Sequence, residues 1–247
     1  MVQPGGYEKC AHLYDLIEPD ESIDAFMHYA LQVDEIIDIG AGTGRVALPM
    51  AEAGVKVFAV EPSPAMRGEL AKRLDQRPEL REFVTIAPAD AASFNFGRTF
   101  EAVFMSGSFG HLIDDQERLR ALTNVWQHLE TGGWLIFDVA LGLMKDMPMA
   151  PAGEVTVGDT TYRRSVERKV APGAILEVTT VYEALRGGTP EERIEETSRV
   201  GIIDLAGIHR LLSEAGFLVD HEYDDYNRLP YQETCDVLFI EASKRPF

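Results

Sequence analysis

The hydrophobic pattern in the first part of the chain alternates between helical and extended periods. Residues 20–32 place apolar side chains on one face of a helix, and residues 36–39 then form a short run rich in isoleucine. A second helical stretch, residues 43–53, ends at a glycine and is followed by the apolar, extended residues 55–60. Two strands joined by one helix over so short a stretch predict a βαβ unit with parallel, buried strands.

The alternation continues toward the carboxyl terminus. It predicts a helix at 64–75, strands at 83–86 and 100–105, a helix at 114–129, a strand at 133–140, a helix at 205–216, and strands at 217–224 and 235–243. Repeated β and α elements of this kind specify a doubly wound α/β fold around a mainly parallel sheet. In that architecture, ligands bind beyond the carboxyl ends of the strands.

The pattern breaks between residues 150 and 201. The segments VTVGDTTYRRSVERKV and ILEVTTVYEALRGG alternate apolar and polar residues around turn signals at 158–159 and 172–173. This alternation predicts antiparallel strands rather than further βαβ units. We therefore expect a single domain, residues 1–247, with an inserted antiparallel β lid at residues 150–201.

Charge and composition narrow the possible partners and the location. The chain has 23 Lys plus Arg and 41 Asp plus Glu, a formal net charge of −18. This balance weighs against unaided binding to nucleic acid or an anionic membrane. An acidic surface that keeps the protein soluble is the simpler interpretation, and a cationic small substrate is the alternative. Cys10 and Cys235 have no metal-ligand spacing, no apolar run is long enough to cross a bilayer, and the start MVQPGGYEKCAH lacks a signal-peptide pattern. These features favour a cytoplasmic protein without a metal site.

Three glycines, Gly40, Gly42 and Gly44, follow the first predicted strand, and Glu61 ends the second. Glycines there let bare backbone approach a ligand, and an acid at that place can accept hydrogen bonds from ribose hydroxyls. A dinucleotide fingerprint would need G-x-G-x-x-G, but Arg45 occupies the place of its third glycine. Asp38, directly before the loop, would repel a pyrophosphate and attract a ligand with ammonium and sulfonium groups.

DIGAGTG followed by VEPS resembles the S-adenosylmethionine-binding core of the class I methyltransferases, over about residues 35–140. The resemblance implies a Rossmann-like fold with an antiparallel last strand, with S-adenosylmethionine as cofactor and S-adenosylhomocysteine as product. It also implies that Glu61 contacts the ribose, that Asp90 contacts the adenine amino group, and that the carbonyl of Met105 contacts the cofactor ammonium. The residues predicted to bind the cofactor are Asp38, Gly40, Ala41, Gly42, Gly44, Arg45, Glu61, Pro62, Met66, Asp90, Ala91 and Met105.

Two further segments, SGSFGHLIDDQERLRAL and GGYEKCAHLYDLIEP, resemble the fourth-strand loop and the amino-terminal flap of small-molecule N-methyltransferases that act on amino sugars or glycine. An amine acceptor must lose a proton before it can attack, and a histidine or a tyrosine oxygen can assist. His111 and Tyr14 are the predicted catalytic residues, and Tyr7 and Phe109 are the predicted substrate walls. For each of them, ordinary packing is the alternative.

Other functions stay open at the level of sequence. The same core serves small-molecule O-methyltransferases, and the same fold serves nicotinamide-dependent oxidoreductases. A non-catalytic cofactor-binding protein is a further alternative, because no residue is an unambiguous base. The insert carries a basic group that suits a solvated strand face, a substrate phosphate or carboxylate, or the contact between copies in a homo-oligomer; its members are Arg163, Arg164, Arg168 and Lys169.

Overall fold

A computed structural model describes residues 7–17, 22–141, 145–232 and 237–245. Its central sheet has eight strands, in the order β11 (Leu229–Pro230), β10 (Phe217–Asp224), β12 (Val237–Lys244), β5 (Leu129–Ala140), β4 (Phe100–Met105), β1 (Glu35–Ile39), β2 (Lys56–Val60) and β3 (Val84–Ala87). Strands β1 to β5 pair in parallel, whereas β12 pairs antiparallel with both β5 and β10. The predicted doubly wound sheet with an antiparallel last strand is confirmed.

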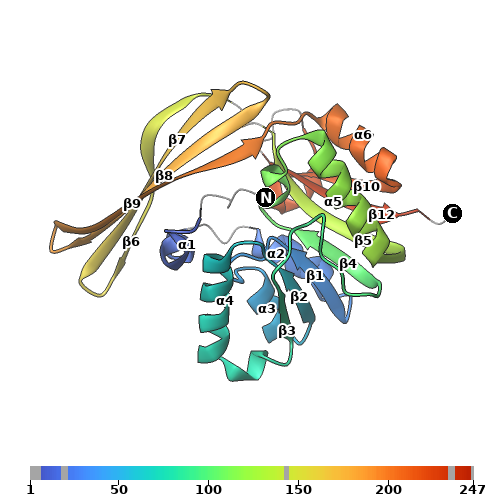
Figure 1. Ribbon diagram of the computed structural model, residues 1–247, viewed down its shortest axis with the longest axis horizontal. Coiled ribbons are helices and arrows are strands. Elements are labelled where there is room, and N and C mark those ends of the chain that lie inside the picture. Colours follow the sequence, from blue (N-terminus) through green and yellow to red (C-terminus); the bar gives the residue numbers. More distant parts are fainter. Residues whose placement is uncertain (1–6, 18–21, 142–144, 233–236, 246–247) are drawn as a thin grey trace.

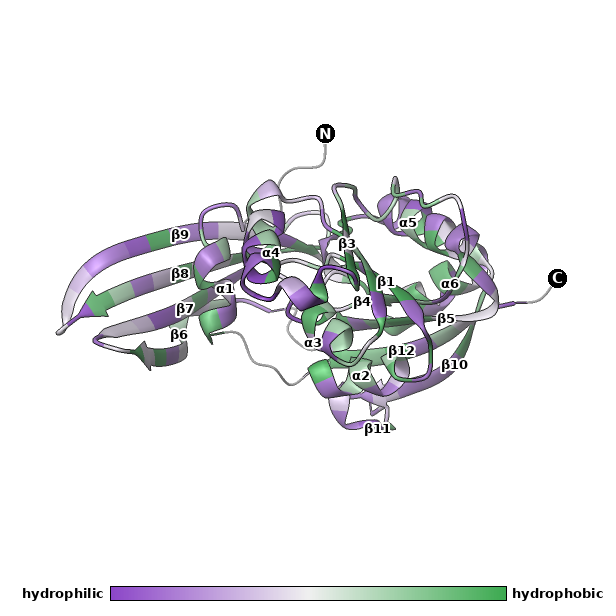
Figure 2. Cartoon of the chain, turned by 90° about the horizontal axis from the view of Figure 1, so that it is seen from below, coloured by the Kyte–Doolittle hydropathy of each residue, from purple (hydrophilic) through white to green (hydrophobic). Residues whose placement is uncertain are grey.

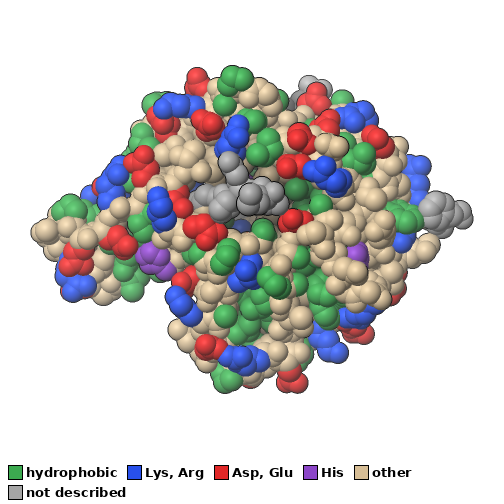
Figure 3. All heavy atoms as spheres, in the orientation of Figure 1, with side chains coloured by type: hydrophobic (Ala, Val, Ile, Leu, Met, Phe, Trp, Pro, Cys, Tyr) green, Lys and Arg blue, Asp and Glu red, His purple; other side chains and the backbone are tan. Residues whose placement is uncertain are grey.

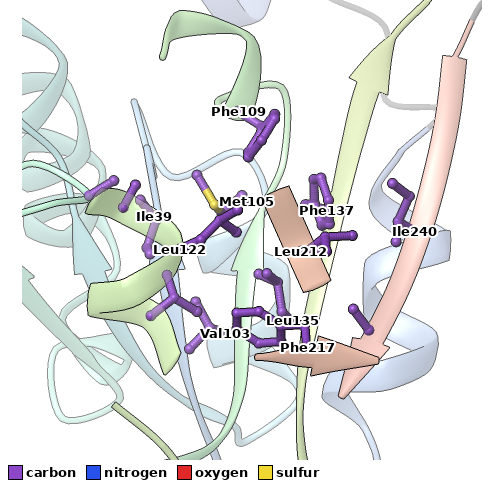
Figure 4. Packing of buried hydrophobic residues seen from close by; sticks show 14 of the residues in the cluster. Ile39, Val103, Met105, Phe109, Leu122, Leu135, Phe137, Leu212, Phe217 and Ile240 are labelled. Atoms are coloured by element: carbon purple, nitrogen blue, oxygen red, sulfur yellow. The ribbon is translucent and has the colours of Figure 1, made fainter. Parts of the chain in front are cut away.

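Helices cover both faces of this sheet (Figure 1). One face packs against α2 (Ile23–Ala30), α3 (Ala47–Glu52) and α4 (Pro64–Gln76), and the other against α5 (Asp115–His128) and α6 (Leu205–Ala215). Because neighbouring strand residues point to opposite faces, Ile36 belongs to the first apolar cluster and Ile37 to the second. Figure 4 shows part of the second cluster, where side chains of β4, β5, α5 and α6 meet.

The inserted segment forms a second, four-stranded antiparallel sheet. Its strands are β6 (Met147–Val157), β7 (Thr160–Ala171), β8 (Ile175–Arg186) and β9 (Thr189–Gly201), in sequence order. The sheet extends to one side of the central sheet, and α1 (Ala11–Ile17) lies between it and α4 (Figure 1). Figure 2 shows hydrophobic stretches along the central strands, whereas hydrophilic and hydrophobic stretches alternate on the inserted strands, as expected for a sheet with one solvated face.

In the described ranges, the remaining elements are three short 3₁₀ helices, η1 (Pro78–Leu80), η2 (Phe109–His111) and η3 (Asp225–Asn227). Element boundaries differ from the prediction mainly at α3, which begins at Ala47 rather than at residue 43, and at β5, which begins at Leu129 rather than at residue 133. The glycines before α3 have positive φ angles, so residues 43–46 form turns before the helix can begin. The insert begins at Met147 rather than at residue 150. Residues 20–21 and 235–236, predicted to start a helix and a strand, lie outside the described residues.

Charged side chains of both signs are intermixed over the face in Figure 3. Many of them pair locally, such as Arg163 with Glu154 and Lys169 with Glu167 on the insert. Exposed pairs of this kind contribute about 0–1 kcal/mol each. In the described part of the chain, no helix is long and apolar enough to cross a membrane.

Candidate active site

A cavity of about 660 Å³ opens at the carboxyl ends of β1 and β4. The strand order reverses between these two strands, which is where an open α/β sheet binds its ligands. The volume lies within the range of about 300–1,000 Å³ that small-molecule sites occupy. The walls come from the loop after β1, the ends of β2 and β4, the segment before α1, and residues 197–199 of β9.

The glycine loop brings backbone to the cavity wall. Gly40 has a φ of 74°, and a Cβ there would lie 2.4 Å from the Cβ of Ser108, so this position accepts only glycine. The N–H groups of Gly40 and Ala41 both donate to the carbonyl oxygen of Val60, at 2.8 and 3.2 Å, which ties the loop to the end of β2. The backbone of residues 40–42 therefore has one fixed path along the ligand space.

Gly44 has a different role from the one the sequence predicts. It does not line the cavity, and a Cβ on it would lie 2.4 Å from Cδ1 of Leu70 and 3.1 Å from Cγ of Leu48. With a φ of 87°, it lets the loop turn into α3 while α3 and α4 pack closely. The structure thus places this glycine in the helix packing instead of at the cofactor-binding position.

Glu61 is held rigidly at the end of β2. Its Oε2 accepts the N–H of Gly42 and its Oε1 accepts the N–H of Ser63, both at 2.8 Å. Ser63 caps α4 by accepting the N–H of Met66, and Arg67 donates to the main-chain oxygen of Glu61 at 2.7 Å. Each carboxylate oxygen keeps a second lone pair for a ligand. Burial raises the pKa of Glu61, while the N–H groups of Ser63 and Gly42 oppose that rise.

Asp38 carries the most deeply buried carboxyl of the cavity wall, with 1% of its surface exposed. Its Oδ2 makes no hydrogen bond to any described residue. Burial raises the pKa of Asp38 to about 7, the negative charge of Glu61 adds to the rise, and Arg45 opposes it. Glu8 and Asp90 also line the cavity. This surplus of carboxyl groups suits a cationic ligand.

The loop after β4 is held in place by Asp138, a residue that the sequence pattern does not single out. Asp138 on β5 accepts the N–H of Gly107 at 2.7 Å and the hydroxyl of Tyr226 at 3.1 Å. Burial raises the pKa of Asp138 to about 6, although these two donors and Arg45 lower it. Ser108 donates its hydroxyl to the carbonyl of Ile39 at 2.7 Å. The β1 and β4 ends are thereby joined into one wall.

Two hydroxyl groups on the cavity wall also lack a hydrogen-bond partner among the described residues. Thr43 and Ser106 both line the cavity, and their side-chain oxygens make no hydrogen bond to the described residues. Buried polar atoms usually have partners, so a group of them around one cavity indicates a polar ligand.

The remaining cofactor positions line the cavity as the sequence predicts. Asp90 accepts the N–H of Ala92 at 3.0 Å, which forms a local turn. Asn124 of α5 donates to the carbonyls of Ala91 and Phe94, both at 3.1 Å, and fixes that turn. Of the predicted cofactor residues, those on the cavity wall are Asp38, Gly40, Ala41, Gly42, Arg45, Glu61, Pro62, Met66, Asp90, Ala91 and Met105.

His111, Tyr7 and Tyr14 meet at the end of the cavity that faces the insert. The hydroxyl of Tyr7 lies 3.2 Å from Nε2 of His111, and Nδ1 of His111 lies 3.3 Å from the carbonyl oxygen of Arg199. The ring of Tyr7 contacts those of Tyr14 and His111 edge-on, at centroid distances of 5.4 and 5.5 Å. Burial lowers the pKa of His111, so the ring is neutral at pH 7.

Phe109 lies elsewhere. Its side chain is 1% exposed and packs in the core, with its ring centroid 4.9 Å from that of Phe137 (Figure 4). The sequence predicts a substrate wall at Phe109, two residues before His111, but in η2 His111 lines the cavity whereas Phe109 is buried away from it. The structure therefore assigns Phe109 to the packing of the loop.

A smaller cavity of about 100 Å³ adjoins the main one between α1 and the inserted sheet. It shares Tyr7, Tyr14 and Ser198 with the main cavity, and Arg164 lines it on the insert side. Of the basic group predicted on the insert, Arg164 thus faces a cavity, whereas Arg163 and Lys169 form exposed ion pairs.

The sequence pattern missed the cavity residues supplied by β9, namely Thr197, Ser198 and Arg199. Glu8 was also missed, although it lies in the segment before Tyr14 that resembles a flap. Nothing in the local sequence marks the β9 residues, because the insert folds back onto the sheet from far along the chain. Among the described residues, no group of three or more His, Cys, Asp or Glu side chains could hold a metal ion.

Comparison with known proteins agrees with this geometry. Residues 36–133 match the family model described as "Methyltransferase domain". This part of the chain is therefore similar to methyltransferase domains. This match covers the glycine loop, Glu61, Asp90, Met105 and His111, and it ends before the insert.

A curated relative, the cypemycin N-terminal methyltransferase of Streptomyces sp, is 32% identical over 147 residues, which are 56% of this chain and 58% of that protein. The chain spans 65% of the length of another curated methyltransferase that it matches. In both comparisons, the matched segment covers less than two thirds of the relative's own length.

Solved structures share the fold over most of the chain. An S-adenosylmethionine-dependent methyltransferase from Clostridium acetobutylicum ATCC 824 superposes with a TM-score of 0.78 at 16% identity, covering 97% of this chain and 99% of that one. The sugar N-methyltransferase KedS8 from Streptoalloteichus sp ATCC 53650 has a TM-score of 0.73 at 21% identity, covering 93% and 89%. The coverage extends beyond the methyltransferase domain into the insert.

The buried carboxyl of Asp38 predicts how the stability of the ligand-free protein depends on pH. The folded state holds this proton up to about pH 7, whereas the unfolded chain releases it near its ordinary value of 3.8. The folded state therefore binds more protons between these values, and the free energy of unfolding falls as pH rises. We expect Asp38→Asn to remove roughly 2 kcal/mol of this fall between about pH 5 and pH 8.

Urea denaturation at pH 5, 6, 7 and 8 measures this effect. Asp220→Asn, which changes an exposed carboxyl on β10, is the control and keeps the slope of the natural protein. Equal slopes for Asp38→Asn and the natural protein would contradict the assignment of a buried, protonated carboxyl.

Proposed function

We propose that this chain transfers a methyl group from S-adenosylmethionine to an amine of a small polar acceptor, with an amino sugar or an amino acid as first choice. The observation that carries this proposal is one cavity with two different ends. A glycine loop with buried carboxyl groups lies at one end, and a neutral histidine in contact with a tyrosine hydroxyl lies at the other. The first end suits a cationic nucleoside, and the second suits the removal of a proton from an amine.

The residues present fit S-adenosylmethionine. The backbone of Gly40–Gly42 would lie against its methionine part, Glu61 would accept from the ribose hydroxyls, and Met66, Asp90 and Ala91 would surround the adenine. The carbonyl of Met105 would accept from the ammonium group. Gly40 cannot accept a Cβ, and the orphan oxygens of Asp38, Thr43 and Ser106 offer partners for the polar atoms of such a ligand. When bound, the cofactor supplies an activated methyl group on a positively charged sulfur.

Asp38 decides between a cationic cofactor and a dinucleotide. A cation about 4 Å from Asp38 would favour its ionised form by roughly 4 kcal/mol at an effective dielectric of 20, whereas a pyrophosphate would keep the carboxyl protonated and would gain no such attraction. Among the described residues, Arg45 is the cation whose charge lowers the pKa of Asp38. A net negative wall therefore supports S-adenosylmethionine over a nicotinamide cofactor.

The chain's own contribution at the acceptor end begins with the state of His111. A carbonyl oxygen only accepts, so Nδ1 donates to Arg199, and the neutral ring leaves a lone pair on Nε2. The hydroxyl of Tyr7 donates to that lone pair. When an acceptor ammonium gives a proton to the Tyr7 oxygen, Tyr7 can pass its own proton to Nε2. The N–H bond breaks, and its electron pair stays on the amine nitrogen.

Moving a proton from the ammonium to His111 costs free energy, and two effects of the bound complex offset that cost. An aliphatic ammonium with a pKa near 10.4 lies more than about 4 units above a histidine whose pKa is lowered below 6.5, so the transfer costs more than roughly 5 kcal/mol. A like charge about 4 Å from the ammonium raises its free energy by roughly 4 kcal/mol at an effective dielectric of 20, so deprotonation beside a sulfonium relieves most of that cost. Holding the amine about 3–3.5 Å from the methyl carbon contributes roughly 7–11 kcal/mol more.

Several features support a small N-methyl acceptor. One curated relative is named an N-terminal methyltransferase, and one structural neighbour is named a sugar N-methyltransferase. The acceptor end is enclosed by Tyr7, Tyr14 and β9, so a small molecule fits better than a large surface. We therefore interpret residues 150–201 as a lid on a single domain of residues 1–247. The cytoplasmic location, the absence of nucleic-acid and membrane partners, and homo-oligomerisation through the lid stay predictions of the sequence.

Cofactor binding is the first prediction of this function. Calorimetric titration should show binding of S-adenosylmethionine and S-adenosylhomocysteine. Glu61→Gln should weaken S-adenosylhomocysteine binding roughly tenfold or more, because the amide loses an acceptor for Gly42, Ser63 or the ribose. Glu79→Gln, an exposed change on η1, is the control and leaves the affinity unchanged. Tight binding of NAD alone would exclude the methyltransferase proposal and favour an oxidoreductase.

The acceptor class is the second prediction. Incubation of the protein with S-adenosylmethionine and a panel of amino sugars, amino acids and phenols, followed by mass spectrometry, should show methylation on nitrogen. An oxygen acceptor is the nearest alternative, and methylation confined to the phenols would establish it. Cofactor binding with no product from any acceptor would support a non-catalytic protein.

The catalytic pair is the third prediction. His111→Ala and Tyr7→Phe, which remove the two groups of the proposed proton relay, should lower kcat more than they change the cofactor affinity, and His111→Ala should lower it by roughly 100-fold. Tyr14→Phe tests the catalytic tyrosine that the sequence predicts. Burial lowers the pKa of His111, so activity should rise with pH through a value below 6.5 and then level off. In His111→Ala, this rise of activity with pH should be absent. His209→Ala, an exposed histidine on α6, is the control. Unchanged kcat in both His111→Ala and Tyr7→Phe would remove the catalytic assignment.

A further inference from the structure

Strand β9 passes directly beside His111 as it leaves the insert and returns to the central domain. The carbonyl oxygen of Arg199 lies 3.3 Å from Nδ1 of His111, although the two residues are 88 positions apart. The next two residues of the strand, Val200 and Gly201, run against Gly110 and Ile113 on either side of the histidine. The insert and the loop after β4 therefore touch at the proposed base.

Two glycines make this close contact possible. A Cβ on Gly110 would lie 2.9 Å from Cγ1 of Val200, and a Cβ on Gly201 would lie 2.5 Å from the carbonyl oxygen of Ile113. Neither glycine has a positive φ, so the backbone turn does not require them. Their absent side chains serve proximity, because real Cβ atoms do not approach neighbours this closely.

The histidine side of the contact is anchored. Asp114 caps α5 by accepting the N–H of Glu117 at 2.8 Å, and Glu117 accepts the N–H of Ile113 at 3.0 Å. Arg118, buried on the same helix, donates to Asp115 at 2.9 Å. Because α5 holds residues 113–114, an added methyl group at Gly110 separates β9 from η2 instead of shifting the whole loop.

We propose that the end of β9 is a positioning element that sets the tautomer of His111 through the carbonyl of Arg199. This role rests on the proposed function, in which Nε2 receives the proton of the amine. The hydrogen bond is near the outer limit of about 3.2–3.5 Å for N–H···O contacts, so a separation of a few tenths of an ångström breaks it. Without the hydrogen bond to Arg199, the ring proton can move to Nε2, which then donates to Tyr7. Nε2 no longer has a lone pair with which to accept the proton of the amine.

The insert then does more than cover the site. His111 can accept a proton at Nε2 only while β9, the last strand of the insert, lies against η2. The position of the insert is thereby coupled to the tautomer of His111. An orienting carbonyl on the far nitrogen of a histidine is a general device for fixing which nitrogen is protonated.

A set of four variants tests this role. Gly110→Ala introduces the overlap with Val200, Val200→Ala removes the atom it would meet, and the double variant relieves the overlap. Gly68→Ala is the matched control, because Gly68 lies on α4 with nothing within 4 Å of its added Cβ. The first readout is long-range ¹H–¹⁵N correlation of the imidazole rings in the ligand-free protein, with the signals of His111 assigned by their loss in His111→Ala.

In the natural protein, Val200→Ala, Gly68→Ala and the double variant, His111 should be protonated on Nδ1 with Nε2 unprotonated. In Gly110→Ala, protonation should move to Nε2 or divide between the two nitrogens. The second readout is methyl transfer: kcat should fall roughly tenfold or more in Gly110→Ala and recover in the double variant, with cofactor affinity unchanged throughout.

Loss of kcat in Gly110→Ala with an unchanged tautomer would overturn this role, as would failure of Val200→Ala to restore the tautomer. If Gly110→Ala does not fold, the double variant still decides, because it must fold and keep the tautomer of the natural protein. The NMR readout needs no methyl acceptor, so the tautomer pattern stands or falls separately from the methyltransferase proposal.

Discussion

The buried carboxyl of Asp38 is the constraint around which the site is organised. It lies at the end of the central strand β1, 1% exposed, and the carboxylate of Glu61 adds a like charge to its surroundings. An isolated buried charge is costly, so the ligand-free protein keeps this group largely protonated, with a pKa of about 7. A bound cation would favour the ionised form. The site is thus poised for positive charge before any ligand arrives.

Hydrogen bonds from the surrounding backbone and side chains hold the carboxyl groups of the site in fixed positions. Glu61 is fixed by two N–H donors, and Asp138 ties the loop after β4 to Tyr226. Preorganised polar groups interact more strongly with a ligand than mobile ones, because their orientation costs nothing further at the moment of binding. The rigid sheet supplies this order at the cofactor end, where the strands end together.

The acceptor end is built differently. Tyr7 and Tyr14 come from the segment around α1, His111 from η2, and Arg199 from the insert, so three separate parts of the chain must meet there. Such a site depends on packing between elements rather than on one scaffold. The glycines at positions 110 and 201 show how closely the parts approach, and they give the insert a direct influence on the state of the histidine.

The sequence by itself determined the doubly wound sheet, the antiparallel insert and most of the cofactor end. These depend on local patterns, since the hydrophobic period selects strand or helix, and Asp38, the glycine loop after β1 and Glu61 after β2 all follow the carboxyl ends of parallel strands at the same sheet edge. Only the tertiary structure decided that Gly44 and Phe109 face the core, that Asp138 supports the β4 loop, and that β9 meets His111. The direction of a side chain in a short turn and the contact between η2 and β9, whose residues His111 and Arg199 are 88 positions apart, are set by packing between distant segments. No local period encodes them.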